Sequence, residues 1–154
     1  MFKHFLFSIL FSVITFGQIP WNNFSEGIES ASSQNKKIII NIYTDWTSWC
    51  KKMERDVYSQ DNIMQYISKN FVPIKMDAES NNDILFADKN YTEATLIEEE
   101  FGIDGYPSTV FLSSSGEIIT VVPGYVGAEE FLLMLKYINE DAYLKQEWEE
   151  YVNK

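Results

Sequence analysis

The only cysteine of the 154-residue chain, Cys50, carries the side chain best suited to nucleophilic or redox chemistry. It lies in the segment 45–53, which reads Asp-Trp-Thr-Ser-Trp-Cys-Lys-Lys-Met. A lone cysteine excludes an internal disulfide and a zinc site built from several thiolates. What remains is a thiol that either reacts with another molecule or is buried as a small apolar side chain.

Opposing influences act on the acidity of the Cys50 thiol. A position in the first turn of a helix lowers a thiol pKa through the helix dipole, whereas burial and the neighbouring Asp45 raise it. The sequence leaves three interpretations open. Cys50 is a buried structural residue, a monothiol that forms mixed disulfides or reacts with peroxide, or the point of an intermolecular disulfide.

The alternation of strands and helices places Cys50 where a strand gives way to a helix. A continuous β-branched run at 37–43 is typical of a strand buried on both faces, and a helix begins near Trp49. Pro73 restricts the strand at 71–77 to a place where a missing N–H donor is tolerated, near an edge or an end. Two further strands are predicted at 108–112 and 118–122. Further helices are predicted at 21–32, 95–101 and 128–139. Another helix is predicted to continue to residue 67, with Ser59 as its N-cap.

This order predicts an α/β sandwich whose first two strands are parallel and whose last two form an antiparallel hairpin. The polar segment 81–91 is predicted to be a loop insertion. The tail from Asp141 is predicted to continue helically, because Leu144, Trp148 and Val152 are spaced by four residues.

The first segment, 1–17, is typical of a secretory signal peptide. Lys3 and His4 form a short positive region, 5–16 is almost entirely apolar, and cleavage is predicted between Gly17 and Gln18. The apolar run is shorter than the roughly 20 residues of a membrane-spanning helix, so no stable membrane anchor is expected after cleavage. A domain at 18–140 and a C-terminal tail at 141–154 then remain.

The composition excludes several classes of protein. With 12 basic and 23 acidic side chains the formal net charge is −11, which argues against nucleic-acid binding. Hydrophobic residues at 45% and aromatic residues at 16% indicate a folded domain with a sizeable core. The single histidine, His4, falls in the predicted signal peptide, so the mature chain has no histidine base. Scarce Arg with abundant Asn, Lys and Ile indicates a bacterial source, and we expect export to the periplasm, with secretion as the alternative.

Two segments together resemble the active site of the thioredoxin superfamily, in particular its small exported members. They are the segment 45–53 and the downstream segment 102–111, Gly-Ile-Asp-Gly-Tyr-Pro-Ser-Thr-Val-Phe, and the resemblance extends over residues 20–140. It implies a thioredoxin-like α/β fold, with a central mixed sheet of about four strands flanked by helices. It also implies a redox turn and a cis-proline loop, with Pro107 as the cis residue, that together line a groove: Trp46, Thr47, Ser48, Trp49, Tyr106 and Pro107.

One departure from the family pattern changes the expected chemistry. Thr47 occupies the position of the family's first cysteine, the solvent-facing nucleophile, and Cys50 matches the second, resolving cysteine. Asn41 stands where family members often carry a buried acid that assists the resolving thiol. Dithiol exchange needs an attacking thiolate and a neighbour that resolves the mixed disulfide, so ordinary thioredoxin-type turnover is not expected.

Two functions from different classes follow from the sequence. The first is a binding protein in which an extended protein or peptide client, with or without a thiol, pairs with the backbone beside Pro107 as an added strand. In this hypothesis Trp49 is exposed to the client, whereas Trp46 packs beneath the loop. The alternative is a monothiol redox enzyme that uses Cys50 for thiol-disulfide exchange or peroxide reduction and relies on an external thiol. Neither function calls for a cofactor or a metal.

Overall fold

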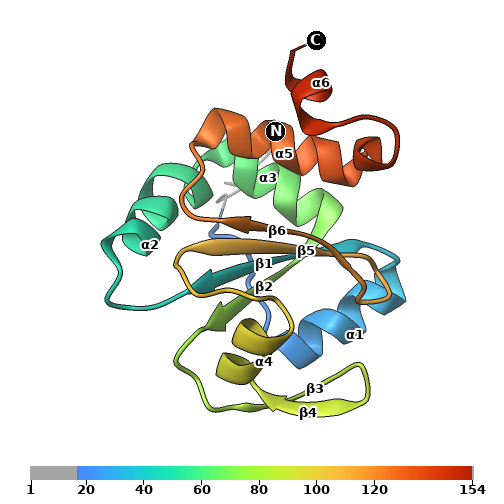
Figure 1. The fold of residues 1–154 in the computed structure, drawn as a ribbon. Helices are drawn as coiled ribbons and strands as arrows, with labels where there is room; N and C mark the ends of the chain where they lie inside the picture. The colour runs from blue at the N-terminus through green and yellow to red at the C-terminus, as the bar shows by residue number, and fades with distance from the viewer. Residues whose placement is uncertain (1–16, 154) are drawn as a thin grey trace, which may run out of the picture.

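A four-stranded mixed sheet runs through the centre of the molecule (Figure 1). In the computed structural model, which describes residues 17–153, the strands lie in the order β2-β1-β5-β6. β1 is parallel to β2 and antiparallel to β5, and β6 is antiparallel to β5. These relations confirm the predicted α/β fold. The strands are β1 (Lys37–Tyr43), β2 (Phe71–Asp77), β5 (Ser108–Leu112) and β6 (Ile118–Pro123).

Strand β1 supplies apolar side chains to both faces of the sheet. Ile38 and Ile40 belong to the core on one face, and Ile39 belongs to the core on the other. This is the reason why the run of isoleucines is continuous rather than alternating. Pro73 lies on β2, an edge strand of the sheet, as its missing donor requires.

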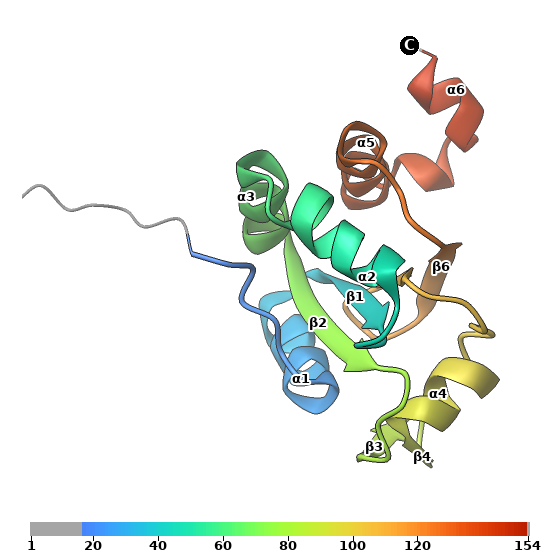
Figure 2. The same ribbon diagram turned by 90° about the vertical axis from the view of Figure 1, so that its left-hand side faces the viewer.

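Helices cover both faces of the sheet (Figure 2). On one face lie α1 (Phe24–Gln34), α4 (Glu93–Glu99) and a small two-stranded hairpin. On the other face lie α2 (Ser48–Met53), the π-helical turn η1 (Glu54–Tyr58), α3 (Asp61–Asn70) and α5 (Ala128–Asn139). Because α2 follows β1 after a short loop, Cys50 lies at the carboxyl end of the central strand.

The segment 81–91, predicted to be a loop, instead forms most of a hairpin. β3 (Asp83–Phe86) pairs antiparallel with β4 (Lys89–Thr92). Ala87 and Asp88 connect the two strands and have positive φ angles of 48° and 62°. A two-residue hairpin turn whose twist matches that of the strands requires positive φ at both of its central residues. Such turns are usually marked by Asn-Gly or Asp-Gly, a signal that Ala-Asp lacks. Ile84 is buried in the core beside α1 and anchors the hairpin.

The first helix begins later than the predicted range of 21–32. α1 starts at Phe24, because the Asn23 side chain accepts a hydrogen bond from the N–H of Glu26 and caps the helix. Trp21 therefore precedes the helix. Its ring contacts Tyr58 edge-on with centroids 5.1 Å apart, on the face of the sheet opposite α1.

Two further helix starts differ from the prediction. α3 begins at Asp61, with Gln60 rather than Ser59 as its N-cap residue. The reason is that η1 extends the preceding helix, and Ser59 is the C-cap residue of η1. α4 begins at Glu93 rather than at Thr95, because Thr92 and Thr95 form a reciprocal capping box.

The C-terminal tail is not one continuous helix as predicted. Asp141 adopts a left-handed conformation with φ of 56°, which ends α5. A 3-10 turn η2 (Ala142–Leu144) and a short helix α6 (Trp148–Val152) follow. Trp148 and Tyr151 pack on Tyr137 of α5 with centroids 5.3 Å and 5.1 Å away.

We expect Trp148→Ala to lower the free energy of unfolding by about 1–2 kcal/mol, because it removes the largest ring of this aromatic cluster. Urea unfolding followed by circular dichroism measures the change. Leu144→Ala is the matched control in the same tail. Leu144 is 70% exposed, so its loss should change stability by no more than about 0.5 kcal/mol. Equal effects of the two substitutions would contradict a specific role of the cluster.

The expected signal peptide, apart from Gly17, lies outside the described residues, so cleavage before Gln18 remains a prediction. Across 17–153, no helix combines the length and hydropathy that crossing a membrane requires.

Candidate functional site

The turn between β1 and α2 holds Thr47 and Cys50 in direct contact. Thr47 is the N-cap residue of α2, and its carbonyl accepts a hydrogen bond of 3.1 Å from the Cys50 N–H. The Thr47 hydroxyl lies 2.5 Å from the hydroxyl of Thr44. Cys50 itself is only 5% exposed. The first position of the turn thus carries a hydroxyl, and the only thiol lies beneath it.

Burial raises the pKa of the Cys50 thiol above its ordinary value. Hydrogen bonds from the Thr44 backbone and the Thr47 side chain act in the opposite direction without reversing the shift. The carboxylate that adds to the rise is Glu54, and Lys75 lowers the pKa. At neutral pH the side chain is therefore a thiol rather than the nucleophilic thiolate.

Glu54 is the residue of this site that sequence reasoning missed. Its carboxylate forms an ion pair with Lys75, with Nζ 2.5 Å from Oε1, and accepts a hydrogen bond of 3.5 Å from the Asn41 amide. Asn41 and Lys75 are neighbours in the register of β1 and β2. Asn41 lies on β1 as predicted, so this strand supplies no acid to the site. An acid is present, and it comes from the helix, four residues after Cys50.

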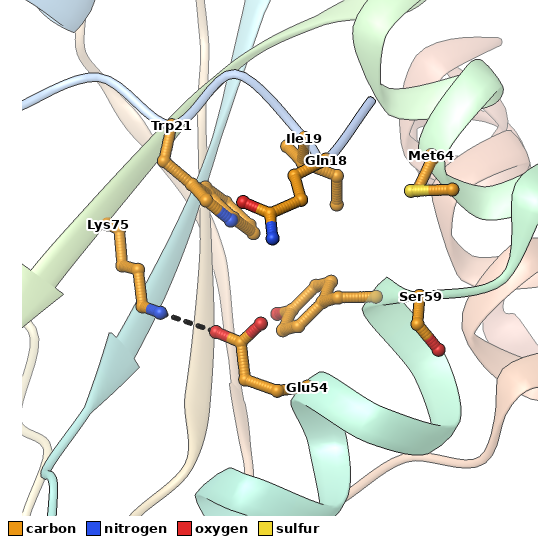
Figure 3. A pocket seen from close by; sticks show the side chains of 8 residues that line it. Gln18, Ile19, Trp21, Glu54, Ser59, Met64 and Lys75 are labelled. Atoms are coloured by element: carbon orange, nitrogen blue, oxygen red, sulfur yellow. Dashed lines mark hydrogen bonds and ion pairs between the residues drawn. The ribbon is translucent and has the colours of Figure 1, made fainter. Parts of the chain in front are cut away.

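A pocket gives solvent access to this ion pair. It has a volume of about 470 Å³, and Figure 3 shows Gln18 and Trp21 above the Lys75–Glu54 contact. Ile19 is buried beside them, so the segment before α1 forms one wall of the pocket. The full lining comprises Gln18, Ile19, Trp21, Glu54, Tyr58, Ser59, Met64 and Lys75.

We expect Glu54→Gln to lower the pKa of Cys50, because the substitution removes a negative charge that disfavours the thiolate. The rate of alkylation by iodoacetamide should then rise at lower pH than in the wild type, since only the thiolate reacts. Lys75→Met removes the positive charge that lowers the pKa of Cys50, so the pH dependence of the alkylation rate should move to higher pH. An identical pH profile for all three proteins would show that the ion pair does not act on the thiol.

A second part of the site is built by the loop before β5 and the loop after β6. The Tyr106–Pro107 peptide bond is cis, and the Pro107 carbonyl accepts a hydrogen bond of 2.8 Å from the Gly124 N–H. Trp49, Tyr106, Gly124 and Tyr125 line a surface hollow of about 340 Å³. Among the described residues, the backbone N–H and C=O of Tyr106 form no hydrogen bond.

The two tryptophans of the turn differ from the expected arrangement. Trp49 is 54% exposed and lies against Tyr125 with centroids 5.6 Å apart, in agreement with its predicted exposure. Trp46 does not pack beneath the loop, because it is 68% exposed and its indole Nε1 donates a hydrogen bond of 3.0 Å to Glu79. Ser48, between them, is also exposed.

The structure therefore brings together two pairs of the predicted site residues. Thr47 contacts Cys50 within the turn, and Trp49 shares a hollow with Tyr106. Trp46 belongs to the exposed surface on the Glu79 side. Within 17–153, no cluster of three or more His, Cys, Asp or Glu side chains is arranged to hold a metal ion.

These features, together with the sheet order, define a thioredoxin-like protein. The thioredoxin-like domain family matches residues 24–139, and the chain belongs to this family.

Known relatives agree with this assignment. The thiol:disulfide interchange protein DsbD of Yersinia pestis is 30% identical over 108 residues, which cover 69% of this chain and 16% of that protein. The chain therefore corresponds to only a small part of these much longer relatives. A thioredoxin-fold protein from Helicobacter pylori has a TM-score of 0.68 at 17% identity, over 78% of this chain and 79% of that chain. The DsbD C-terminal domain of Neisseria meningitidis has a TM-score of 0.56 at 21% identity, over 75% and 92%.

Proposed function

We propose that this protein is an exported thioredoxin-like protein that has lost dithiol chemistry and binds extended peptide or protein clients. The observation that carries the proposal is the turn, in which Thr47 occupies the attacking position above the buried thiol of Cys50. Exchange through two sulfurs needs a thiolate at the first of these positions. Loss of the nucleophile with retention of the surrounding surface favours binding over turnover.

The surface beside the turn supports the binding half of the proposal. The unpaired backbone groups of Tyr106 are those that an extended client needs for strand addition. Trp49 and Tyr125 offer flat aromatic surface next to them, and exposed aromatic residues are frequent energetic centres of interfaces. The name of the Yersinia relative, a thiol:disulfide interchange protein, favours clients whose thiols or disulfides are being handled. The periplasm is the proposed compartment, with secretion as the alternative.

Peptide titration tests this function. We expect capped, extended octapeptides to shift the NMR signals of the Trp49 indole and the Tyr106 amide. Trp49→Ala should weaken binding by roughly tenfold or more, because it removes the largest exposed aromatic surface of the hollow. Leu85→Ala is the matched control, since Leu85 is 64% exposed but lies on the β3–β4 hairpin. If no extended peptide shifts these signals, the binding function is wrong.

A second candidate function is a monothiol redox enzyme, favoured by the position of Cys50 in the first turn of α2 and by the charge of Lys75, which lowers the pKa of the thiol. In this reaction the Cys50 thiolate attacks a client disulfide, and one client sulfur leaves as a thiolate. An external thiolate then attacks the client sulfur of the mixed disulfide, which regenerates the Cys50 thiolate and leaves that thiol bound to the client.

Thiol reactivity separates the two functions. Because burial raises the pKa of Cys50, we expect iodoacetamide to modify it slowly at pH near 7 and quickly once guanidinium unfolds the chain. Mass spectrometry of the alkylated protein follows the reaction. A folded-state rate that matches or exceeds that of free cysteine would favour the enzyme instead.

A further inference from the structure

Three aromatic rings and a glycine bound the hollow beside the cis-proline loop. Trp49 comes from α2, Tyr106 from the loop before β5, and Gly124 and Tyr125 from the loop after β6. The hollow has a volume of about 340 Å³, and none of the four described residues that line it is charged. Its walls therefore offer a client aromatic surface rather than ion pairs.

Tyr125 is the wall of the hollow that needs the most support from side chains. It lies in a short irregular segment between β6 and α5, with Gly124 before it and Gly127 two residues after it. Among the described residues, its own N–H and C=O form no backbone hydrogen bond. Because glycines give a backbone more conformational freedom than other residues do, the ring of Tyr125 depends on side-chain contacts to keep its place.

Helix α2 supplies these contacts. The ring centroid of Tyr125 lies 5.6 Å from that of Trp49, and Lys52 Nζ lies 4.8 Å from the same Tyr125 centroid. An ammonium group at this distance from a tyrosine ring is attracted to the ring face. Trp49 and Lys52 are three residues apart and lie on the same side of α2, so the ring is held against one rigid element.

Lys52 is itself held by Asp56, which lies one helical turn further along the chain. The Lys52 Nζ donates a hydrogen bond of 2.7 Å to Oδ2 of Asp56, and Arg55 Nε donates one of 2.7 Å to Oδ1. The hydrogen bonds from Arg55 and Lys52 lower the pKa of Asp56 to about 2, so the carboxylate stays charged at physiological pH. A free lysine side chain has many rotamers, and this carboxylate restricts them. A series of contacts thus runs from Asp56 through Lys52 to Tyr125.

We propose that the hollow is a preorganised site for an aromatic side chain of the client, and that Lys52 is the positioning residue that keeps Tyr125 in place for it. Aromatic rings in contact attract one another by more than the area they bury, which favours an aromatic client residue over an aliphatic one of similar size. A wall that is already fixed adds no ordering cost when the client binds. This inference rests on the proposed peptide-binding function and names the chemistry of its client.

Matched peptides test the selectivity for an aromatic side chain. Three capped octapeptides of one sequence carry Phe, Leu or Ala at one central position, and NMR titration of the Trp49 indole signal gives their dissociation constants. We expect the Phe peptide to bind about fivefold more tightly than the Leu peptide, and the Ala peptide to bind most weakly. Equal or tighter binding of the Leu peptide would overturn the aromatic selectivity while leaving peptide binding intact. Absence of binding by every peptide would overturn the proposed function, and the inference with it.

Variants of Lys52 test its positioning role. Lys52→Met removes the charge from an unbranched side chain and should reduce the preference for Phe over Leu to less than about twofold, whereas Lys52→Arg keeps a cation and should retain the preference. Lys89→Met removes an ion-paired lysine from the β3–β4 hairpin and should also leave it unchanged. In the free protein, nuclear Overhauser contacts between the rings of Trp49 and Tyr125 should persist in Lys52→Arg and weaken in Lys52→Met. An unchanged preference in Lys52→Met, or ring contacts that do not weaken, would overturn the positioning role.

Discussion

The wild-type protein should fail to reduce insulin, whereas Thr47→Cys should do so at a rate at least about 100-fold above the wild-type background. The introduced thiol would occupy the N-cap position of α2, whose carbonyl accepts a hydrogen bond of 3.1 Å from the Cys50 N–H. It would attack the insulin disulfide, and one insulin sulfur would leave as a thiolate. Cys50 would then attack the sulfur of the introduced residue in the mixed disulfide, the second insulin sulfur would leave as a thiolate, and a dithiol reductant in the assay would reduce the resulting disulfide of the protein for the next cycle. The intramolecular second step removes the need for an external resolving thiol, which is the source of the gain.

Two controls distinguish this reaction from non-specific thiol chemistry. Thr47→Ser keeps the hydroxyl and should remain inactive. Thr47→Cys combined with Cys50→Ala should form a mixed disulfide with insulin and stop there, since no second thiol can release it. Turnover by the unmodified protein would contradict the proposed loss of dithiol chemistry. A Thr47→Cys protein whose two thiols never form a disulfide would show that the geometry of the turn does not support exchange.

Much of the fold follows from local patterns that hydrophobic burial enforces. The continuous isoleucines of β1 have to be buried on both faces, which places this strand in the centre of the sheet. The β3–β4 hairpin could not be predicted, because Ala87 and Asp88 do not favour positive φ strongly enough to mark a turn. The burial of Ile84 against the α1 layer, a tertiary contact, compensates for that weak local preference.

The candidate site was predictable where it depends on spacing along the chain and unpredictable where it depends on contacts across it. The distance of three residues between Thr47 and Cys50 suffices to place both in one helical turn. The Glu54–Lys75 ion pair joins a helix to β2 and is invisible to any local pattern. The spacing of four residues between Cys50 and Glu54 was the one available signal, since it places both on the same side of a helix. The exposure of Trp46 likewise depends on Glu79, 33 positions away.

Gly27 shows how a tertiary contact determines a residue that carries no signal in the sequence. It lies within α1, where glycine is normally unfavourable by roughly 1 kcal/mol relative to alanine. A Cβ at this position would lie 2.3 Å from Cγ1 and 2.4 Å from Cδ1 of Ile74 on β2. Ile74 is fully buried, so its side chain has little room to move away. The close approach of α1 to the sheet thus requires the absence of a side chain.

We therefore expect Gly27→Val to lower the free energy of unfolding by about 3 kcal/mol, in spite of the better helix propensity of valine. Urea unfolding measures the loss, and Glu29→Val on the exposed side of the same helix controls for the β-branched side chain. Adding Ile74→Ala, which removes both atoms that would collide, should make the double variant more stable than the sum of the two single losses by at least about 1 kcal/mol. Strict additivity of the two substitutions would contradict this contact as the cause, because two residues that do not touch have no reason to compensate each other.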